Sequence, residues 1–119
     1  MINLRYVIHP ASCGYFCLKH IICSRKFKRI GYMSLYDMKD VFTRNNYYCF
    51  CCRMKDLNNV KRECVTLINI KNSCHYVVIK RISEKFVYVY DPLFLFERKL
   101  KKDKFMKKWS KICLFYRKI

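Results

Sequence analysis

The sequence predicts an α+β fold in which N-terminal helices pack on an antiparallel sheet. Two observations lead to this prediction. Segments with apolar residues at helical spacing occupy residues 12–45, and runs rich in β-branched and aromatic residues occupy most of the remainder. With 119 residues, the chain is long enough to form one domain with a real core. We therefore expect a single domain over residues 1–119, with a helical part over about 12–45 and a sheet part over about 47–119.

The first helix is predicted over about residues 14–26. Its apolar side chains fall on one stripe, which consists of Cys17, Leu18, Ile21 and Ile22. Ser12 is a suitable N-cap, and it follows an alternating segment over residues 1–8 that suggests a short strand or an extended arm. Cys13 therefore stands at the start of this helix.

A second helix is predicted over about residues 35–43, because apolar residues recur at helical spacing behind Ser34, a good N-cap. The chain then enters the β-leaning residues 47–54 and a short helical turn near residues 57–62. Residues 64–70 are rich in β-branched side chains, so we expect a central strand there.

A β-hairpin is predicted from residues 74–82 and 86–90. An odd number of residues in its loop would place His75 and Asp91 on the same face, whereas a two-residue loop would place them on opposite faces. After the hairpin come residues 93–96, a basic segment over residues 98–108 and a final strand over residues 112–116.

Charge and cysteine content limit the classes of protein to consider. The formal net charge of +18 predicts attraction to polyanions, although an AT-rich gene would also produce many solvated lysines. Nine cysteines without a visible secretory segment indicate reduced thiols, so we expect a cytoplasmic protein, at most at the cytoplasmic side of a membrane. No apolar stretch reaches the length of a membrane span, so an associated transporter would be a separate chain.

Three side chains suggest nucleophilic catalysis. Cys13 lies at a helix start, where unpaired backbone N–H groups and the helix dipole favour a thiolate, and it precedes Gly14, whose small size lets another backbone approach. His75 opens one strand of the hairpin and Asp91 closes the other. A thiol needs a base and the base needs an orienting group, so Cys13, His75 and Asp91 are candidates for these roles. Each residue also has a purely structural interpretation, as a buried thiol, a strand-edge histidine or a turn aspartate.

The chain resembles the double-glycine leader peptidases, the papain-like cysteine protease domains of bacteriocin-exporting ABC transporters. The similarity lies in Cys-Gly-x-x-Cys-Leu from Cys13, His-Tyr-Val-Val from His75, the Asp-Pro that begins at Asp91, and the ending over residues 105–109. This resemblance implies a small papain-like fold and a cysteine peptidase without a cofactor or metal. The implied substrate is a leader peptide with a Gly-Gly cleavage site, and the implied partner is an ABC transporter.

The resemblance also implies further site residues. The family places a glutamine six residues before its cysteine as an oxyanion donor, but Val7 occupies that position here. The backbone N–H of Cys13 and the side chain of His9 are the candidate donors instead. A narrow cleft that admits only glycine could be walled by bulky side chains, for which the candidates are Tyr15, Tyr76 and Trp109.

Three alternatives stay open at this point. The domain could bind peptides without cleaving them, as related noncatalytic domains do. The basic segment over residues 98–108, with interleaved aromatic residues, could bind nucleic acid, although a base-stacking platform is not evident. A zinc site built from Cys49, Cys51, Cys52, Cys64 or Cys74 is a third alternative, but the Cys-x-Cys-Cys spacing fits no zinc knuckle and a strand would split Cys51 from Cys52.

Overall fold

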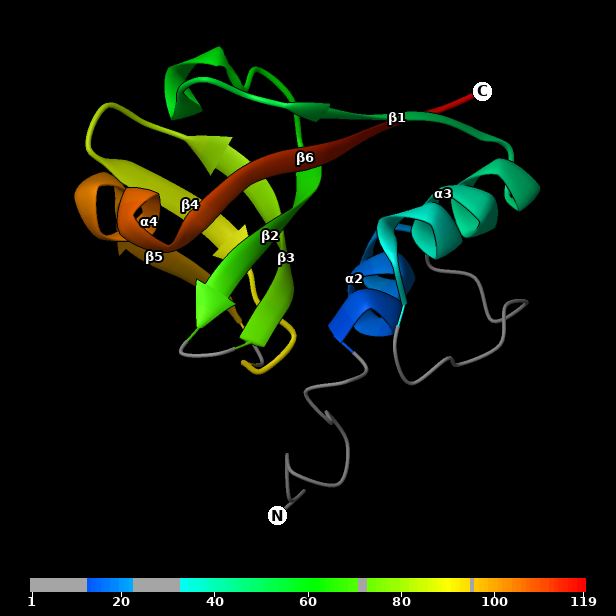
Figure 1. Ribbon diagram of the computed structural model, residues 1–119, viewed down its shortest axis with the longest axis horizontal. Coiled ribbons are helices and arrows are strands. Elements are labelled where there is room, and N and C mark those ends of the chain that lie inside the picture. Colours follow the sequence, from blue (N-terminus) through cyan, green and yellow to red (C-terminus); the bar gives the residue numbers. More distant parts are fainter. Residues whose placement is uncertain (1–12, 23–32, 71–72, 95) are drawn as a thin grey trace.

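The computed structural model describes residues 13–22, 33–70, 73–94 and 96–119. Within these residues, three α-helices pack on one six-stranded antiparallel sheet, which confirms the predicted fold class (Figure 1). The strand order is β1-β6-β2-β3-β4-β5. In chain order the elements are α2 (Cys13–Ile22), α3 (Leu35–Arg44), β1 (Tyr47–Arg53), η2 (Leu57–Asn59), β2 (Cys64–Ile70), β3 (Ser73–Ile82), β4 (Phe86–Tyr90), β5 (Glu97–Lys101), α4 (Lys102–Lys108) and β6 (Trp109–Lys118).

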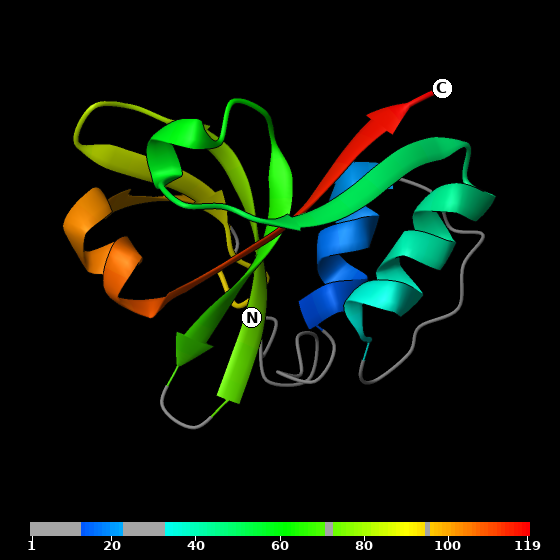
Figure 2. The ribbon, with the colours of Figure 1, turned by 45° about the horizontal axis from the view of Figure 1, so that its top comes forward.

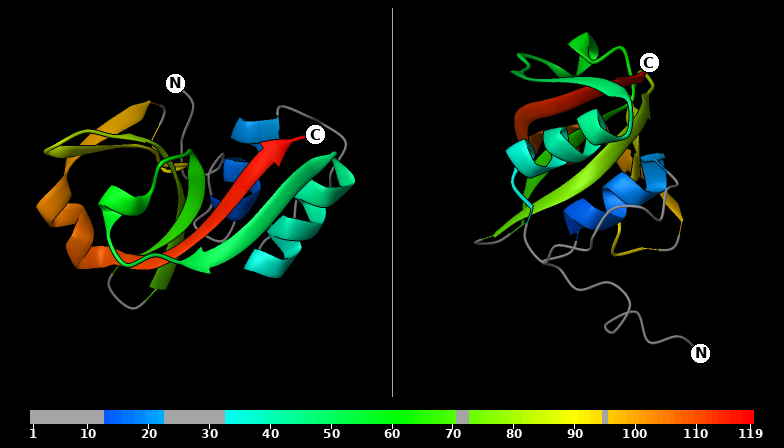
Figure 3. Two further views of the ribbon diagram at one scale, coloured as in Figure 1. Left: turned by 90° about the horizontal axis from the view of Figure 1, so that it is seen from above. Right: turned by 90° about the vertical axis from the view of Figure 1, so that its right-hand side faces the viewer.

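Helices cover the sheet at two separate places. Helices α2 and α3 lie together beside β3, β1 and β6, whereas α4 lies at the far end with β4 and β5 (Figures 1 and 2). Seen from above, the sheet is strongly curved, and β4, β5 and α4 close around its inner side (Figure 3). This curvature gives the molecule two buried apolar clusters, one inside the curve and one beneath α2 and α3.

The cluster beneath α2 and α3 fixes the first helix against the sheet. Cys17 and Leu18 of α2 and Phe42 of α3 are fully buried, and they pack with Val78 of β3 and Leu114 of β6. Burying a large apolar side chain contributes about 1.5–3 kcal/mol, so this cluster determines where the start of α2 points. The stripe expected at Cys17 and Leu18 is therefore the packed face of the helix.

Helix α3 begins as the sequence predicts. The Ser34 hydroxyl accepts a hydrogen bond from the Asp37 N–H at 3.1 Å, and the Asp37 carboxylate accepts one from the Ser34 N–H at 2.9 Å. This reciprocal capping box satisfies two N–H groups at the helix start. At the other end, Asn46 has a positive φ of 66°, and β1 follows directly, with no helix between α3 and β1.

Two parts of the fold differ from the prediction. The basic segment contains strand β5 and helix α4, and Phe105 of α4 is completely buried inside the curved sheet. The final strand is longer than expected, because β6 begins at Trp109 and pairs with both β1 and β2. The central position expected for residues 64–70 is correct, since β2 lies between β6 and β3. The arm over residues 1–8 and the capping residue Ser12 lie outside the described residues.

Candidate active site

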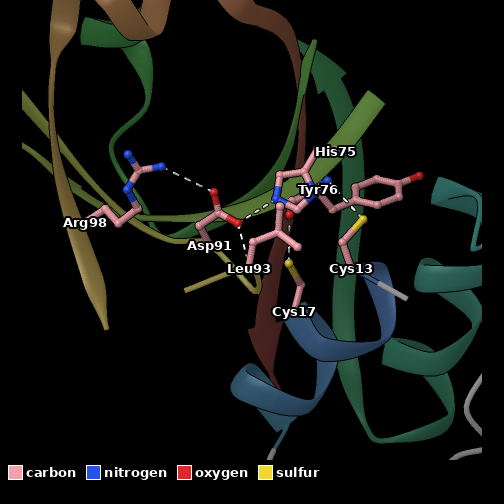
Figure 4. A network of polar contacts seen from close by, with 7 residues as sticks. All are labelled: Cys13, Cys17, His75, Tyr76, Asp91, Leu93 and Arg98. Carbon is pink, nitrogen blue, oxygen red and sulfur yellow. Dashed lines mark hydrogen bonds and ion pairs between the residues drawn. The ribbon is translucent and has the colours of Figure 1, made fainter. Parts of the chain in front are cut away.

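The fold brings Cys13, His75 and Asp91 to one end of the sheet (Figure 4). Cys13 is the first residue of α2, His75 lies near the start of β3, and Asp91 follows the last residue of β4. All three are buried, with exposed fractions of 5%, 5% and 3%. The three segments are distant in sequence and meet because α2 packs on β3 and β3 pairs with β4.

A β-bulge in the hairpin places His75 and Asp91 on the same face. Four residues, 83–86, lie between the paired residues Ile82 and Val87, and this even number would by itself put the two side chains on opposite faces. Lys80, however, is one extra residue on β3. Ile79 pairs with Val89 and Arg81 pairs with Tyr88, the adjacent residue of β4, so Lys80 is the bulged residue between them. The same-face arrangement expected from an odd loop is therefore produced by the bulge.

His75 lies between the carboxylate and the thiol. Its Nε2 is 2.6 Å from Asp91 Oδ1, so the imidazole N–H donates to the carboxylate. Nδ1 is the other ring nitrogen, and Cys13 is near enough to influence the pKa of His75. The Cys13 sulfur additionally accepts the backbone N–H of Tyr76 at 3.3 Å. The sulfur is thus bound to the backbone of the residue that follows His75.

The surroundings of His75 favour its protonated form. Burial lowers the pKa of this imidazole, but the hydrogen bonds and charges of Asp91 and Cys13 outweigh burial and raise the pKa to about 9. The imidazolium form of His75 is therefore favoured at neutral pH, and this is the form that can donate a proton.

Asp91 is held by three groups. Oδ1 accepts hydrogen bonds from His75 and from the Leu93 backbone N–H at 3.0 Å, while Oδ2 lies 3.6 Å from Nη1 of Arg98. Burial raises the pKa of this carboxyl, yet His75, the Leu93 N–H and the Arg98 charge together bring it below its usual value. Asp91 is therefore an anion in a buried position. Sequence reasoning missed Arg98, which it placed in the basic segment.

The other candidate residues occupy different environments. Tyr76 and Tyr15 are half-buried, and the Tyr76 ring lies against Gly14, where an added Cβ would be 3.4 Å from Tyr76 Cδ2. The three atoms nearest to such a Cβ all belong to the side chains of Met33 and Tyr76. Trp109 is only 5% exposed and donates its indole N–H to Thr66 Oγ1 at 2.8 Å within the core. Trp109 is therefore a core residue in this structure, and its role as a wall of the substrate cleft stays a prediction.

Cys17 lies one turn beyond Cys13 and is a core residue. Its thiol is fully buried and lies 3.4 Å from the Tyr76 carbonyl oxygen. Burial, followed by the charges of Cys13 and Asp91, raises the pKa of this thiol well above its ordinary value.

Val7 and His9, the residues relevant to the oxyanion hole, lie outside the described residues. Over the described part of the chain, no three His, Cys, Asp or Glu side chains are grouped so that they could hold a metal ion. In the same ranges, no helix is both long and apolar enough to cross a membrane.

A curved antiparallel sheet with a helix that carries a cysteine toward a His–Asp pair defines a papain-like cysteine peptidase architecture. The model of the Peptidase C39 family matches residues 25–118, so this chain belongs to that family. The match includes His75 and Asp91, whereas Cys13 precedes it. The comparison with curated proteins finds no match.

Solved structures share the fold at low sequence identity. The peptidase domain of Streptococcus mutans ComA superimposes with a TM-score of 0.74 at 14% identity, over 92% of this chain and 94% of that chain. A double glycine motif protease from an AMS/PCAT transporter, solved in complex with the leader peptide, gives a TM-score of 0.74 at 18% identity, over 100% of this chain and 88% of that chain. At these identities the similarity establishes the fold.

Proposed function

We propose that this chain is a cysteine endopeptidase that cleaves peptides after small residues. Cys13 is the nucleophile, His75 the general acid and base, and Asp91 the group that orients His75. The observation that carries the proposal is the contact of 2.6 Å between His75 Nε2 and Asp91 Oδ1, two buried side chains. The Cys13 sulfur is held by the N–H of Tyr76, the residue after His75, at 3.3 Å. Nucleophilic thiol catalysis requires such a thiol, base and orienting carboxylate at one site.

The reaction proceeds in two steps. Cys13 Sγ attacks the peptide carbonyl carbon while its proton is held by His75, and His75 then protonates the leaving amine, which departs and leaves a thioester on Cys13. A water molecule next gives a proton to His75 and attacks the thioester, which releases the acid product and restores the thiol. Asp91 stays ionised throughout and holds the ring so that one nitrogen always faces sulfur.

The oxyanion formed in each step needs hydrogen-bond donors. The backbone N–H of Cys13 is one donor in this proposal. His9 is the proposed second donor, because Val7 at the position of the family's glutamine has no side-chain N–H.

The proposed substrate is a leader peptide with a Gly-Gly cleavage site. The support is membership of the Peptidase C39 family and the fold shared with a double glycine motif protease solved with a leader peptide. Tyr15 and Tyr76 are bulky, half-buried side chains near Cys13, and such side chains suit the selection of substrate residues without a Cβ. By the same likeness, we place the reaction at the cytoplasmic side of a membrane, with an ABC transporter as partner.

Cleavage of a synthetic Gly-Gly leader peptide tests the proposal. The native chain should release the leader at the Gly-Gly bond, and Cys13→Ala should abolish release. Cys51→Ala is the matched control, because it removes an exposed thiol of β1 and should leave the rate unchanged. Equal cleavage by the native chain and Cys13→Ala, or no cleavage by either, would overturn the proposal.

A domain that binds the leader without cleaving it is the second candidate. The observation that favours it is Val7, which removes the family's side-chain oxyanion donor. In that case the native chain and Cys13→Ala would bind the leader with equal affinity, and neither would produce a cleaved product.

A further inference from the structure

The Arg98 guanidinium faces the carboxylate of Asp91, the acidic member of the His75–Asp91 pair. Its Nη1 lies 3.6 Å from Asp91 Oδ2, the oxygen that neither His75 nor the Leu93 N–H uses (Figure 4). The two carboxylate oxygens therefore have different partners. One is bound to the imidazole and the backbone, and the other faces the guanidinium.

The fold holds Arg98 in this position from two directions. Strand β5 pairs with β4, with Arg98 opposite Val89, so its backbone is fixed beside the strand that leads to Asp91. Its guanidinium carbon lies 4.1 Å from the centre of the Phe94 ring. Phe94 belongs to the turn after Asp91, because its N–H donates to the Asp91 carbonyl at 2.9 Å. The arginine is thus packed against the same turn that carries the carboxylate.

This position has an energetic consequence. Asp91 is 3% exposed, and a buried carboxylate is costly unless charges and hydrogen bonds compensate for lost water. A carboxylate bound at only one oxygen could rotate about its side-chain bonds. A second contact at Oδ2 restricts that rotation, so Oδ1 stays directed at His75.

We propose that Arg98 is a positioning residue, which keeps the Asp91 carboxylate ionised and oriented so that His75 presents its other nitrogen to Cys13. This inference rests on the proposed peptidase function and adds a fourth residue to it. In this role Arg98 acts through Asp91, so its loss should lower kcat and leave KM unchanged.

The test compares three variants of the full chain. Arg98→Met keeps the apolar stem over Phe94 and removes the charge, whereas Arg98→Lys restores a charge. Lys99→Met is the matched control, because Lys99 is the next residue on β5 and its loss changes the net charge equally. The Lys99 Nζ also lies 4.1 Å from the centre of an aromatic ring, which belongs to Phe86. Adjacent strand residues point to opposite faces, so Lys99 faces away from Asp91.

Two readouts are measured. The first is kcat and KM on the Gly-Gly leader peptide, where Arg98→Met should lower kcat roughly five- to tenfold. The second is the NMR signal of the His75 Nε2 proton at neutral pH, which a hydrogen bond to a carboxylate moves far downfield. That signal should move upfield or broaden in Arg98→Met, and Arg98→Lys should recover much of both effects.

The inference is overturned if Arg98→Met keeps the native kcat and the native proton signal, or if Lys99→Met changes them equally. Should Arg98→Met not fold, as judged by circular dichroism, Arg98→Gln is measured and judged by the same two results. The proton signal does not depend on hydrolysis. Failure of the peptidase function, seen as no effect of Cys13→Ala, is therefore distinguishable from failure of the role of Arg98.

Discussion

At the residue scale, the site depends on the buried side chains of Cys13, His75 and Asp91 and on the partly exposed Arg98 beside Asp91. Each member compensates for the burial of the next, since an isolated charge of this kind would be strongly destabilising. His75 illustrates this balance. Burial alone would favour the neutral ring, yet Asp91 and Cys13 raise the pKa of the imidazole to about 9.

The raised pKa of His75 predicts a loss of stability at alkaline pH. A group whose pKa is higher in the folded state contributes stability that is complete below its unfolded pKa, here 6.5, and is lost as pH rises through 9. We expect the advantage of the native chain over His75→Gln in unfolding free energy to shrink by on the order of 3 kcal/mol between about pH 6 and about pH 10. Urea titrations of both proteins measure this difference. A gap that is constant with pH would contradict the raised pKa.

The sequence contains the signals for Cys13, His75 and Asp91, because each stands at the end of an element that periodicity reveals. Arg98 could not be found in the same way. Its role depends on β5 pairing with β4, and its sequence surroundings are lysines that read as a solvated basic segment. The sequence signal for this role is a single arginine among lysines, in the strand that follows the buried aspartate.

At the element scale, the site is assembled by α2 lying on β3 and by the bulge at Lys80. The hairpin was predictable from its alternating apolar residues, but the bulge was not, because no glycine or other sequence mark distinguishes Lys80. Helix α4 was also missed. Lysines occupy most of its positions, and only Phe105 is fully buried, so the apolar spacing of an amphipathic helix is absent.

The close contacts of α2 with Met33 and with Tyr76 of β3 make Gly14 sensitive to substitution. A Cβ at this position would lie 3.2 Å from Met33 Cβ and 3.4 Å from Tyr76 Cδ2. Because Met33 Cβ is attached to the backbone, it cannot move aside like the end of a side chain. We expect Gly14→Ala to lower the unfolding free energy by about 1 kcal/mol, since overpacking outweighs the gain in helix propensity.

Chemical denaturation of Gly14→Ala measures this effect. Lys19→Ala is the matched control, because Lys19 is an exposed residue of the same helix and its replacement should change stability by less than about 0.5 kcal/mol. A stabilised Gly14→Ala protein would show that the contact with Met33 and Tyr76 is looser than the structure indicates.

At the scale of the whole molecule, burial of two apolar clusters stabilises the fold against repulsion within a strongly charged surface. The net charge of +18 on 119 residues repels itself, and the described ion pairs offset only part of it. The two clusters on opposite sides of the curved sheet supply the opposing stabilisation. The charge and the apolar content can be counted in the sequence. The curvature that divides the core in two becomes visible only once the strand pairing is known.

This charge balance predicts that salt stabilises the fold. Raising NaCl from about 10 mM to about 300 mM shortens the range of repulsion between lysines and should raise Tm by about 3–5 °C. Differential scanning calorimetry at constant pH measures the shift. A Tm that falls with salt would mean that attractive ion pairs outweigh the repulsion.

The most direct test of the active site is the order in which cysteines react with iodoacetamide at neutral pH, followed by mass spectrometry. Cys13 is 5% exposed, whereas Cys51 and Cys74 are exposed. If His75 activates the Cys13 sulfur, Cys13 is labelled first despite its burial, and His75→Gln removes that advantage. Labelling of Cys51 and Cys74 ahead of Cys13 in the native chain would contradict the account.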